Sequence, residues 1–327
     1  MYEKAGESVE AQQEAKIKLP VVMGPTASGK TGLAVELAKH LNGEVVSADS
    51  MQIYAALSIG TARPTVEEMQ GIPHHLTGFL PLSEGYSVAR YVQDAAREIA
   101  AVNAQGRWPI LCGGTGLYIQ SLIENIAFDE QAESNEALRT QLRARAAEEG
   151  GQALLDELAA VDPETAARLH PNDTGRIVRA LEVYHTTGET LSEHARRSRR
   201  HPSPYDACLL LLDFHDRQVL YERINRRVDA MLAAGLVEEA REALATPYAP
   251  TAMQAIGYKE LAPYLAGDVS LAEAVENLKR ATRRYAKRQL SWFRRMESVQ
   301  PLYVDEYPDT AALTAAAWNV IRTHYGV

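Results

Sequence analysis

Short apolar runs and longer amphipathic stretches alternate along the first part of the chain. The runs at 17–23, 44–47 and 108–111 are continuous and short, which is typical of strands buried on both faces of a parallel sheet. Between them, apolar positions recur at the three- and four-residue spacing of a helix, first over 33–41 and then over 87–104. This strand–loop–helix alternation predicts an α/β fold with a parallel sheet.

The pattern changes after about residue 128. Residues 133–200 show no convincing strand and are rich in Ala, Glu, Leu and Arg. A strand pattern returns at 207–214, so we expect an all-helical unit inserted into one α/β domain. Helix-breaking residues divide the inserted unit at 150–151, 162–163, 171–173 and 188. After it we expect helices near 217–234, 236–245 and 270–296, a short strand at 302–304 and a last helix from about 309.

Composition and charge narrow the class of protein. Hydrophobic residues make up 46% and charged residues 24% of 327 residues, which is ordinary for a globular protein. No apolar run approaches the ~20 residues that a membrane helix needs, and residues 1–16 lack the apolar segment of a signal peptide. Cys112 and Cys208 lie in apolar runs without zinc-site spacing, so buried thiols in a reducing cytoplasm are expected. The net charge of −9 argues against nucleic acid unless basic residues cluster.

One motif indicates phosphate chemistry. It follows the first predicted strand, opens the first predicted helix and fits the P-loop pattern G-x-x-x-x-G-K-[ST]. Its amides would form an anion nest at a helix N-terminus, with a mobile lysine charge and a hydroxyl able to bind Mg²⁺ at Thr31. A kinase, a nucleotide hydrolase and a diphosphate-releasing transferase all remain open, so ATP binding is indicated only by the motif. The residues are Gly24, Pro25, Thr26, Ala27, Ser28, Gly29, Lys30 and Thr31.

Two further polar residues follow predicted strands. Asp49 and Thr115 stand at the carboxyl ends of the second and third strands, where open α/β sheets bind their ligands. Asp49 is a candidate general base or magnesium ligand, and the alternative is a turn or N-cap aspartate. Thr115 could equally cap the helix that follows it. The predicted fold is therefore a P-loop NTPase-like parallel sheet core with an inserted all-helical domain and a helical C-terminal part.

A basic stretch stands out in this acidic chain. Residues 279–295 carry eight basic residues and no acidic one, at spacings that gather several on one side of a helix. A face of one sign favours a polyanion, most simply a nucleic acid backbone, and the alternative is a solvated face with distant acidic partners. A second basic cluster at 196–201 ends the helical insertion. Two patches on two units suit a ligand large enough to touch both.

Several strings together resemble the bacterial tRNA dimethylallyltransferase family, also called tRNA isopentenyltransferases or IPP transferases. The resemblance spans about residues 20–300. Besides the P-loop, it rests on SADSMQIY at 47–54, IGTARP at 59–64, IPHHL at 72–76, GGTGLY at 113–118, HPND at 170–173, RALE at 179–182, IGYKE at 256–260 and the stretch 282–292.

The resemblance implies an activity and a set of partners. Such an enzyme transfers a dimethylallyl group from dimethylallyl diphosphate to N6 of the adenosine 3′ of the tRNA anticodon, with Asp49 as base and Thr115 in the substrate channel. The P-loop and Mg²⁺ would hold the diphosphate, and the helical domain would clasp the anticodon stem-loop. The implied tRNA contacts, besides Asp49 and Thr115, are Ser50, Met51, Gln52, Arg139, Gly175, Arg176, Ile177, Val178, Arg179, Gln254, Gly257, Tyr258, Lys259, Thr282, Arg283, Arg284, Lys287, Arg288 and Gln289.

Some expectations remain alternatives. Arg223 and Arg227, four apart on one predicted helix, are candidates for the diphosphate, and exposed or acid-paired side chains are the other interpretation. Prenylation of a free adenine nucleotide, a nucleoside kinase, and a non-catalytic RNA-binding protein are rival functions. We expect a cytoplasmic monomer. The expected organisation is a flexible tail at 1–16, a first core part at 17–131, the helical domain at 132–204 and a second core part at 205–327.

Overall fold

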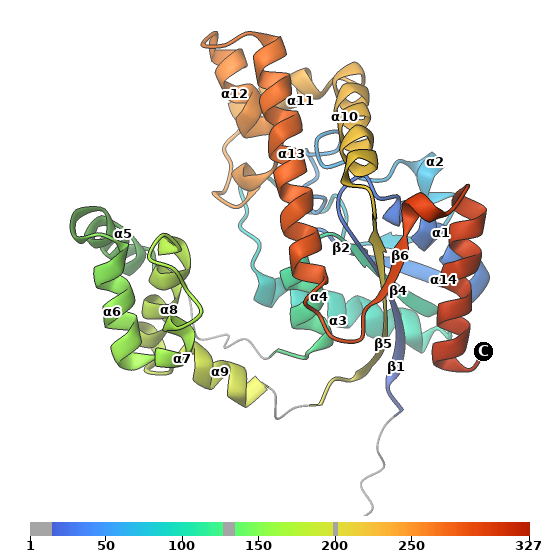
Figure 1. Ribbon diagram of the computed structural model, residues 1–327, viewed down its shortest axis with the longest axis horizontal. Coiled ribbons are helices and arrows are strands. Elements are labelled where there is room, and N and C mark those ends of the chain that lie inside the picture. The colour runs from blue at the N-terminus through green and yellow to red at the C-terminus, as the bar shows by residue number, and fades with distance from the viewer. Residues whose placement is uncertain (1–14, 127–134, 199–201) are drawn as a thin grey trace, which may run out of the picture.

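The computed structural model describes residues 15–126, 135–198 and 202–327 (Figure 1). The expected tail at 1–16 lies outside the described residues except for its last two positions, and so does the expected boundary at 131–132. Within the described part of the chain, no helix is both long and apolar enough to cross a membrane.

The core is one sheet of six parallel strands in the order β3-β2-β4-β1-β5-β6. Its central strand β1 pairs with β4 on one side and with β5 on the other, and residues 19–23 of β1 are fully covered. Continuous apolar runs therefore form the middle of the sheet, as expected for parallel strands. The strands are β1 Ile17–Met23, β2 Gly43–Ala48, β3 His74–His75, β4 Trp108–Gly113, β5 Tyr205–Asp213 and β6 Gln300–Tyr303.

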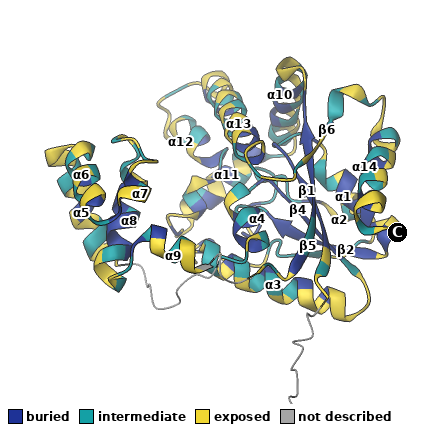
Figure 2. Cartoon of the chain, turned by 60° about the horizontal axis from the view of Figure 1, so that its bottom comes forward, coloured by how far each residue is buried: buried dark blue, intermediate teal, exposed yellow. Residues whose placement is uncertain are grey.

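Helices cover both faces of the sheet. The strands between them are therefore largely buried, as their dark blue colour in Figure 2 shows. One face packs against α1 and α14, and the other against α3, α4 and the helices α10 to α13. The side chains of the two inner faces form two apolar clusters separated by the sheet. The core helices are α1 Lys30–Leu41, α2 Val66–Met69, α3 Val88–Ala104, α4 Gly116–Ile123, α10 Arg217–Ala233, α11 Leu236–Ala245, α12 Tyr258–Ala266, α13 Leu271–Phe293 and α14 Thr310–Tyr325, with short 3₁₀ turns η1 Ala252–Gln254 and η2 Val304–Glu306.

The predicted α/β fold is confirmed, and most predicted elements are observed within a few residues of their expected bounds. The two-residue strand β3 and the helices α2 and α12 were not predicted, because each is short or lacks a clear apolar repeat. The basic helix ends at Phe293 and not at 295. Its C-cap Arg294 is turned to Asp213 at the end of β5, where both guanidinium hydrogen bonds measure 2.8 Å.

In the described part of the chain between α4 and β5, five helices form a unit beside the core (Figure 1). They have their own apolar cluster, which includes the buried Leu154, Leu158 and Leu181. The chain leaves the core after α4 and returns before β5, and there Asn125 Nδ2 donates to the Pro202 carbonyl at 3.3 Å. The helices are α5 Glu136–Glu149, α6 Gly151–Val161, α7 Pro163–Ala166, α8 Thr174–Thr187 and α9 Leu191–Ser198.

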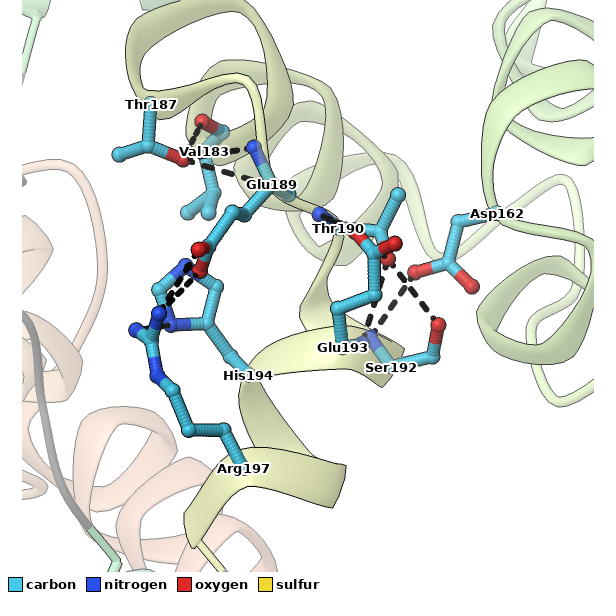
Figure 3. Close-up of polar contacts among 9 residues, drawn as sticks. All are labelled: Asp162, Val183, Thr187, Glu189, Thr190, Ser192, Glu193, His194 and Arg197. Atoms are coloured by element: carbon cyan, nitrogen blue, oxygen red, sulfur yellow. Dashed lines mark hydrogen bonds and ion pairs between the residues drawn. The ribbon is translucent and has the colours of Figure 1, made fainter.

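A polar network fixes α9 to the rest of this helical unit (Figure 3). Asp162 accepts from the Thr165 amide at the start of α7 and from the Ser192 amide in α9, at 3.0 and 3.1 Å. Glu189 and Arg197 form an ion pair of 2.7 Å. Arg196 also donates to the Ser192 carbonyl at 3.3 Å, so both described arginines of the basic cluster expected at 196–201 are engaged locally, and residues 199–201 lie outside the described residues.

Candidate active site

The P-loop connects β1 to α1 at the carboxyl edge of the sheet. Gly24 leaves no room for a side chain there, because a Cβ atom would lie 2.7 Å from the Leu212 carbonyl oxygen of β5. Ala27 and Gly29 then take positive φ angles of 63° and 97°, which turn successive amides inward before α1 begins at Lys30. The structure thus has the strand, tight turn and helix N-terminus that an anion nest requires.

Two P-loop side chains have the properties of a site for an anion. The Ser28 hydroxyl is buried and has no hydrogen-bond partner among the described residues. The Lys30 Nζ donates to the Pro25 carbonyl at 2.7 Å. Burial, with a smaller contribution from the positive charge of Arg227, lowers the pKa of Lys30 to about 8. A bound anion would supply the missing partner to Ser28 and a counter-charge to Lys30.

Gln289 of α13 connects the P-loop to the turn after β4. Its Oε1 accepts from the Thr26 amide at 2.9 Å, and its Nε2 donates to the Gly114 carbonyl at 2.8 Å. The side chain is buried, so it faces the P-loop and not the exposed side of the basic helix. The side-chain amide of Gln289 is therefore not available for the predicted contact with tRNA. Its oxygen and nitrogen already join the P-loop to the turn after β4.

Asp49 follows β2 and serves first as a turn residue. Its Oδ1 accepts from the Met51 and Gln52 amides at 2.8 and 3.2 Å. Its other carboxylate oxygen receives no hydrogen bond from the described residues. Asp49 lies close enough to Lys30 and Arg227 for its charge to act on both groups. Asp49 can therefore hold the turn through Oδ1 and have a chemical role through its second carboxylate oxygen.

Thr115 stands at the N-cap position of α4, but its side chain does not cap the helix. Its Oγ1 instead accepts from the Ser50 amide at 3.0 Å and lies 3.3 Å from the Ser50 hydroxyl. The loops after β2 and β4 are therefore joined at the residue next to Asp49. Tyr285 of α13 lies near Thr115 and Asp49, and burial together with the charge of Asp49 raises the pKa of this tyrosine.

Two arginines of α10 complete the surroundings of the P-loop. Arg223 donates from Nε to the Ala27 carbonyl at 2.8 Å. Burial lowers the pKa of Arg227, which makes no hydrogen bond or ion pair with any described residue. The interpretation of these two side chains as exposed or acid-paired is wrong. Arg227 is a partly buried cation beside the nest that is close enough to Asp49 and Glu68 to be influenced by their charges but forms no ion pair with either, which is an arrangement suited to an anionic ligand.

Some basic side chains of α13 form ion pairs within the protein, and others do not. Lys279 pairs with Asp229 at 2.6 Å, and Arg283 pairs with Glu276 at 3.0 Å. The exposed Arg284 and Lys287 have no ion-pair partner among the described residues, and the exposed Arg288 lies over the Tyr285 ring at 5.6 Å. Thr282 donates to the Leu278 carbonyl of its own helix at 2.8 Å. The polyanion face expected from the sequence therefore loses Lys279 and Arg283 to ion pairs and keeps the exposed Arg280, Arg284, Lys287 and Arg288.

The helical unit holds two of the predicted tRNA-binding arginines on one carboxylate. Arg139 of α5 and Arg179 of α8 both reach Glu182 Oε2 at 2.8 Å. Glu182 is buried, and although burial opposes ionisation, the two guanidinium hydrogen bonds lower its pKa. Arg176 and Gly175 are exposed at the start of α8.

Two predicted contacts in α8 require a correction. Ile177 and Val178 pack inside the helical unit with 0% and 2% exposure. Their side chains cannot contact tRNA in this conformation, because they are on the apolar face that holds α8 against α5 and α6.

The remaining predicted segment surrounds the start of α12. Gln254 and Lys259 are exposed, whereas Gly257 and Tyr258 are buried. The Tyr258 hydroxyl donates to Glu239 of α11 at 2.7 Å, so this side chain also faces inward. Only the exposed members of the segment present side chains to a ligand from outside.

Comparison with known proteins adds a family to this geometry. The family model described as IPP transferase matches residues 52–296. The chain belongs to the IPP transferase family. Two relatives named tRNA dimethylallyltransferase are the protein of Geobacillus thermodenitrificans, 50% identical over 86% of this chain and 89% of the relative, and that of Caldanaerobacter subterraneus, 47% identical over 89% and 93%.

Solved structures of IPP transferases have the same fold. A tRNA isopentenylpyrophosphate transferase from Bacillus halodurans has a TM-score of 0.69 and 42% identity, over 95% of this chain and 99% of that chain. A eukaryotic dimethylallyltransferase, described as acting on tRNA, has a TM-score of 0.78 and 31% identity, over 92% of this chain and 77% of that chain. The predicted family and its P-loop NTPase-like fold are confirmed.

Sequence reasoning missed three side chains of this IPP transferase site. Tyr285 was counted only as part of a basic helix, Gln289 was assigned outward, and Glu239 was not considered. Each lies beside residues that are distant from it in the chain, so no local motif marks it. The periodicity of α13 could have placed Tyr285 and Gln289, four residues apart, on one face of the helix.

Proposed function

We propose that this chain transfers a dimethylallyl group from dimethylallyl diphosphate to N6 of the adenosine 3′ of the anticodon in tRNA, releasing diphosphate. The observation that carries the proposal is the P-loop site itself. The buried unpartnered hydroxyl of Ser28, the Lys30 amine and the unpaired Arg227 surround one anion nest, with the Asp49 carboxylate nearby.

The leaving group decides what this arrangement can do. In the reaction, a bond forms between N6 and the allylic carbon while the bond from that carbon to the diphosphate oxygen breaks. Negative charge grows on the departing diphosphate. Inward amides, Lys30 and the arginines Arg223 and Arg227 stabilise that charge where it develops, and this lowers the barrier.

Asp49 is the general base for the adenine amine. An exocyclic adenine amine is a weak nucleophile and loses a proton when it is alkylated. Oδ1 of Asp49 is held by the Met51 and Gln52 amides, so the second oxygen is oriented toward a substrate without further ordering of the side chain. It accepts the N6 proton. The adenine must leave its stack to reach this edge of the sheet.

Mg²⁺ fits this site as a partner of the diphosphate. The described residues contain no group of three or more His, Cys, Asp or Glu side chains able to hold a metal ion by themselves. Mg²⁺ typically takes one or two protein oxygens and completes its shell with substrate phosphates and water. Thr31 at the start of α1 would offer the hydroxyl ligand. When bound, the ion neutralises charge on the diphosphate.

The RNA is held by two surfaces. The exposed cations of α13 contact the backbone near the site, and the exposed arginines of the helical unit clasp the anticodon stem-loop from the side. Contacts to the RNA phosphates supply affinity, and contacts to the splayed bases of the anticodon loop supply specificity for the RNA sequence. A cytoplasmic enzyme that acts as a monomer remains the prediction from the sequence.

Labelled dimethylallyl diphosphate tests the proposal. The protein is incubated with Mg²⁺ and either unmodified tRNA or AMP, and the label is followed on each acceptor. Transfer to tRNA and mapping of the label to the adenosine 3′ of the anticodon is the expected result. Label on AMP alone would indicate a transferase that acts on free nucleotides and would contradict the proposal. In a separate assay with labelled ATP, phosphate transfer to a nucleoside would indicate a kinase. Tight tRNA binding without any transfer would leave a non-catalytic RNA-binding protein.

A further inference from the structure

Glu239 of α11 collects an unusual number of hydrogen bonds away from the P-loop. Its Oε2 accepts from the Ser58 amide, the Ser58 hydroxyl and the Ile59 amide at 2.9, 2.7 and 2.8 Å. Its Oε1 accepts from the Gly60 amide at 2.9 Å and from the Tyr258 hydroxyl at 2.7 Å. Five donors thus converge on one half-buried carboxylate.

The loop after β2 is folded around this carboxylate. Three successive amides, at 58, 59 and 60, point to it, which is the geometry of an anion nest whose anion belongs to the protein. Gly60 is required by the close approach, because a Cβ atom there would lie 2.7 Å from the Tyr258 hydroxyl. Although burial opposes ionisation, the hydrogen bonds from the loop and from Tyr258 lower the pKa of Glu239.

The same loop holds the segment that follows Asp49. Gln52 Nε2 donates to the Thr61 and Ala62 carbonyls at 3.2 and 3.0 Å, while the Gln52 amide donates to Asp49 Oδ1 at 3.2 Å. A continuous set of contacts therefore runs from Glu239 through the loop to Gln52 and Asp49. Through Tyr258, the same carboxylate also fixes the start of α12.

We propose that Glu239 is a positioning residue that holds Gln52 and Asp49, and with them the start of α12, in the geometry that receives the target adenosine. The inference rests on the proposed transfer to tRNA. The role belongs to the nucleic-acid side of the site, because the P-loop is held by other groups, namely Gln289 and Arg223.

Glu239→Gln tests this role with little change in volume. The glutamine amide nitrogen cannot accept, so either the Gly60 amide or the Ser58 and Ile59 amides lose their acceptor while the neighbouring apolar contacts stay. We expect kcat for tRNA to fall roughly tenfold or more, since a displacement of about 1 Å in a catalytic group can cost ~100-fold in rate. The KM for tRNA should rise, whereas the inhibition constant of inorganic diphosphate should stay within about twofold because the nest is untouched.

The matched control is Glu238→Gln on the same helix. Glu238 is exposed and, among the described residues, forms an ion pair only with Arg241, at 3.6 Å, so this variant should have the activity of the protein without substitutions. Tyr258→Phe removes one of the five donors and should give a smaller loss of kcat in the same direction. All rates are compared at a temperature well below each variant's unfolding midpoint.

Three outcomes overturn the inference. One is unchanged kcat and KM for tRNA in Glu239→Gln. Another is an equal weakening of tRNA and diphosphate binding, which would mean a general structural role. If Glu239→Gln does not fold, Tyr258→Phe with unchanged tRNA kinetics contradicts the inference on its own. Failure of the proposed function would look different, because then the unchanged protein would transfer no label to tRNA.

Discussion

The carboxyl edge of the sheet and the helical unit both present arginines, but they hold them differently. Beside the P-loop, Arg227 is partly buried, has a lowered pKa and makes no hydrogen bond or ion pair with the described residues. In the helical unit, Arg139 and Arg179 share the carboxylate of Glu182, and Arg176 is exposed to solvent. A cation without a partner in a low-dielectric place has unfavourable self-energy until an anion arrives, whereas a paired or solvated cation does not.

This difference assigns separate tasks to the two regions. Unpaired charge beside the nest is strongly coupled to charge that develops in the reaction, so its loss should act on catalysis. Exposed charge on the helical unit acts through solvent, is screened by salt and should act on tRNA affinity. The predictions below test this division, from the largest expected effect to the smallest.

The first substitution is Asp49→Asn. The amide oxygen of asparagine can still accept from the Met51 and Gln52 amides, so the turn is kept while the base is lost. We expect kcat to fall roughly 10²- to 10⁴-fold, as for loss of a general base, with tRNA affinity nearly unchanged. Single-turnover transfer and tRNA binding are measured side by side. Asp309→Asn is the control, since Asp309 caps α14 in a similar way, through the Ala312 amide, and has no hydrogen bond to Thr115 or to the P-loop. A variant Asp49→Asn with full turnover would remove the assigned base.

The second substitution, Arg227→Met, tests the role of the cation beside the P-loop. It deletes the unpaired cation and keeps the apolar stem. We expect kcat/KM for dimethylallyl diphosphate to fall about 10- to 100-fold, which corresponds to a charged hydrogen bond of roughly 1.5–3 kcal/mol. Arg226→Met is the matched control, because Arg226 is the exposed neighbour on α10. Equal losses in both variants would mean that general positive charge, and not the position beside the nest, is what counts.

The pH dependence of diphosphate binding follows from Lys30. Its pKa is lowered to about 8, and the protonated form binds an anion. As pH rises through 8, a growing fraction of the free protein must take up a proton before binding. The apparent dissociation constant of inorganic diphosphate should therefore rise about tenfold by pH 9. Lys30→Arg should lose this dependence, and any pH effect common to both proteins belongs to the ligand. Identical profiles would contradict the assignment.

Arg176→Met probes the helical unit and should give the smallest effect. We expect tRNA affinity to weaken a few-fold and the slope of log K against log salt to become shallower by about one, with kcat unchanged. Binding is measured over a series of salt concentrations. Arg168→Met is the control, since Arg168 lies in the same unit and pairs locally with Glu164. A loss of kcat in Arg176→Met would break the division between the two regions.

The sequence predicted the parts of this molecule that local patterns determine. The strands, the P-loop and the position of Asp49 at the end of β2 were found, because parallel strands and the phosphate nest have distinctive residue spacing. What it could not show is which groups meet across the fold. Gln289 lies 263 residues from Thr26 and Glu239 lies 181 residues from Ser58, and only tertiary packing joins each pair.

The same reason explains the wrong assignments. Ile177 and Val178 lie between the family strings at 170–173 and 179–182, yet those strings do not say which side of α8 faces the unit's own core. Lys279 likewise looked unpaired because its partner Asp229 lies on another helix, whereas the partner of Arg283 is Glu276 of α13 itself, just before the basic stretch.

The hydrogen bond between Asn125 and Pro202 has a consequence for how such a molecule can change over time. Because the chain departs and returns at one point, the helical unit is a closed loop on an otherwise complete sheet. Lengthening or shortening such a loop changes its closure entropy only logarithmically, by about 0.6 kcal/mol for each doubling. The unit can therefore gain or lose helices while the P-loop stays as it is, so the helical unit is free to diversify independently of the sheet that carries the P-loop.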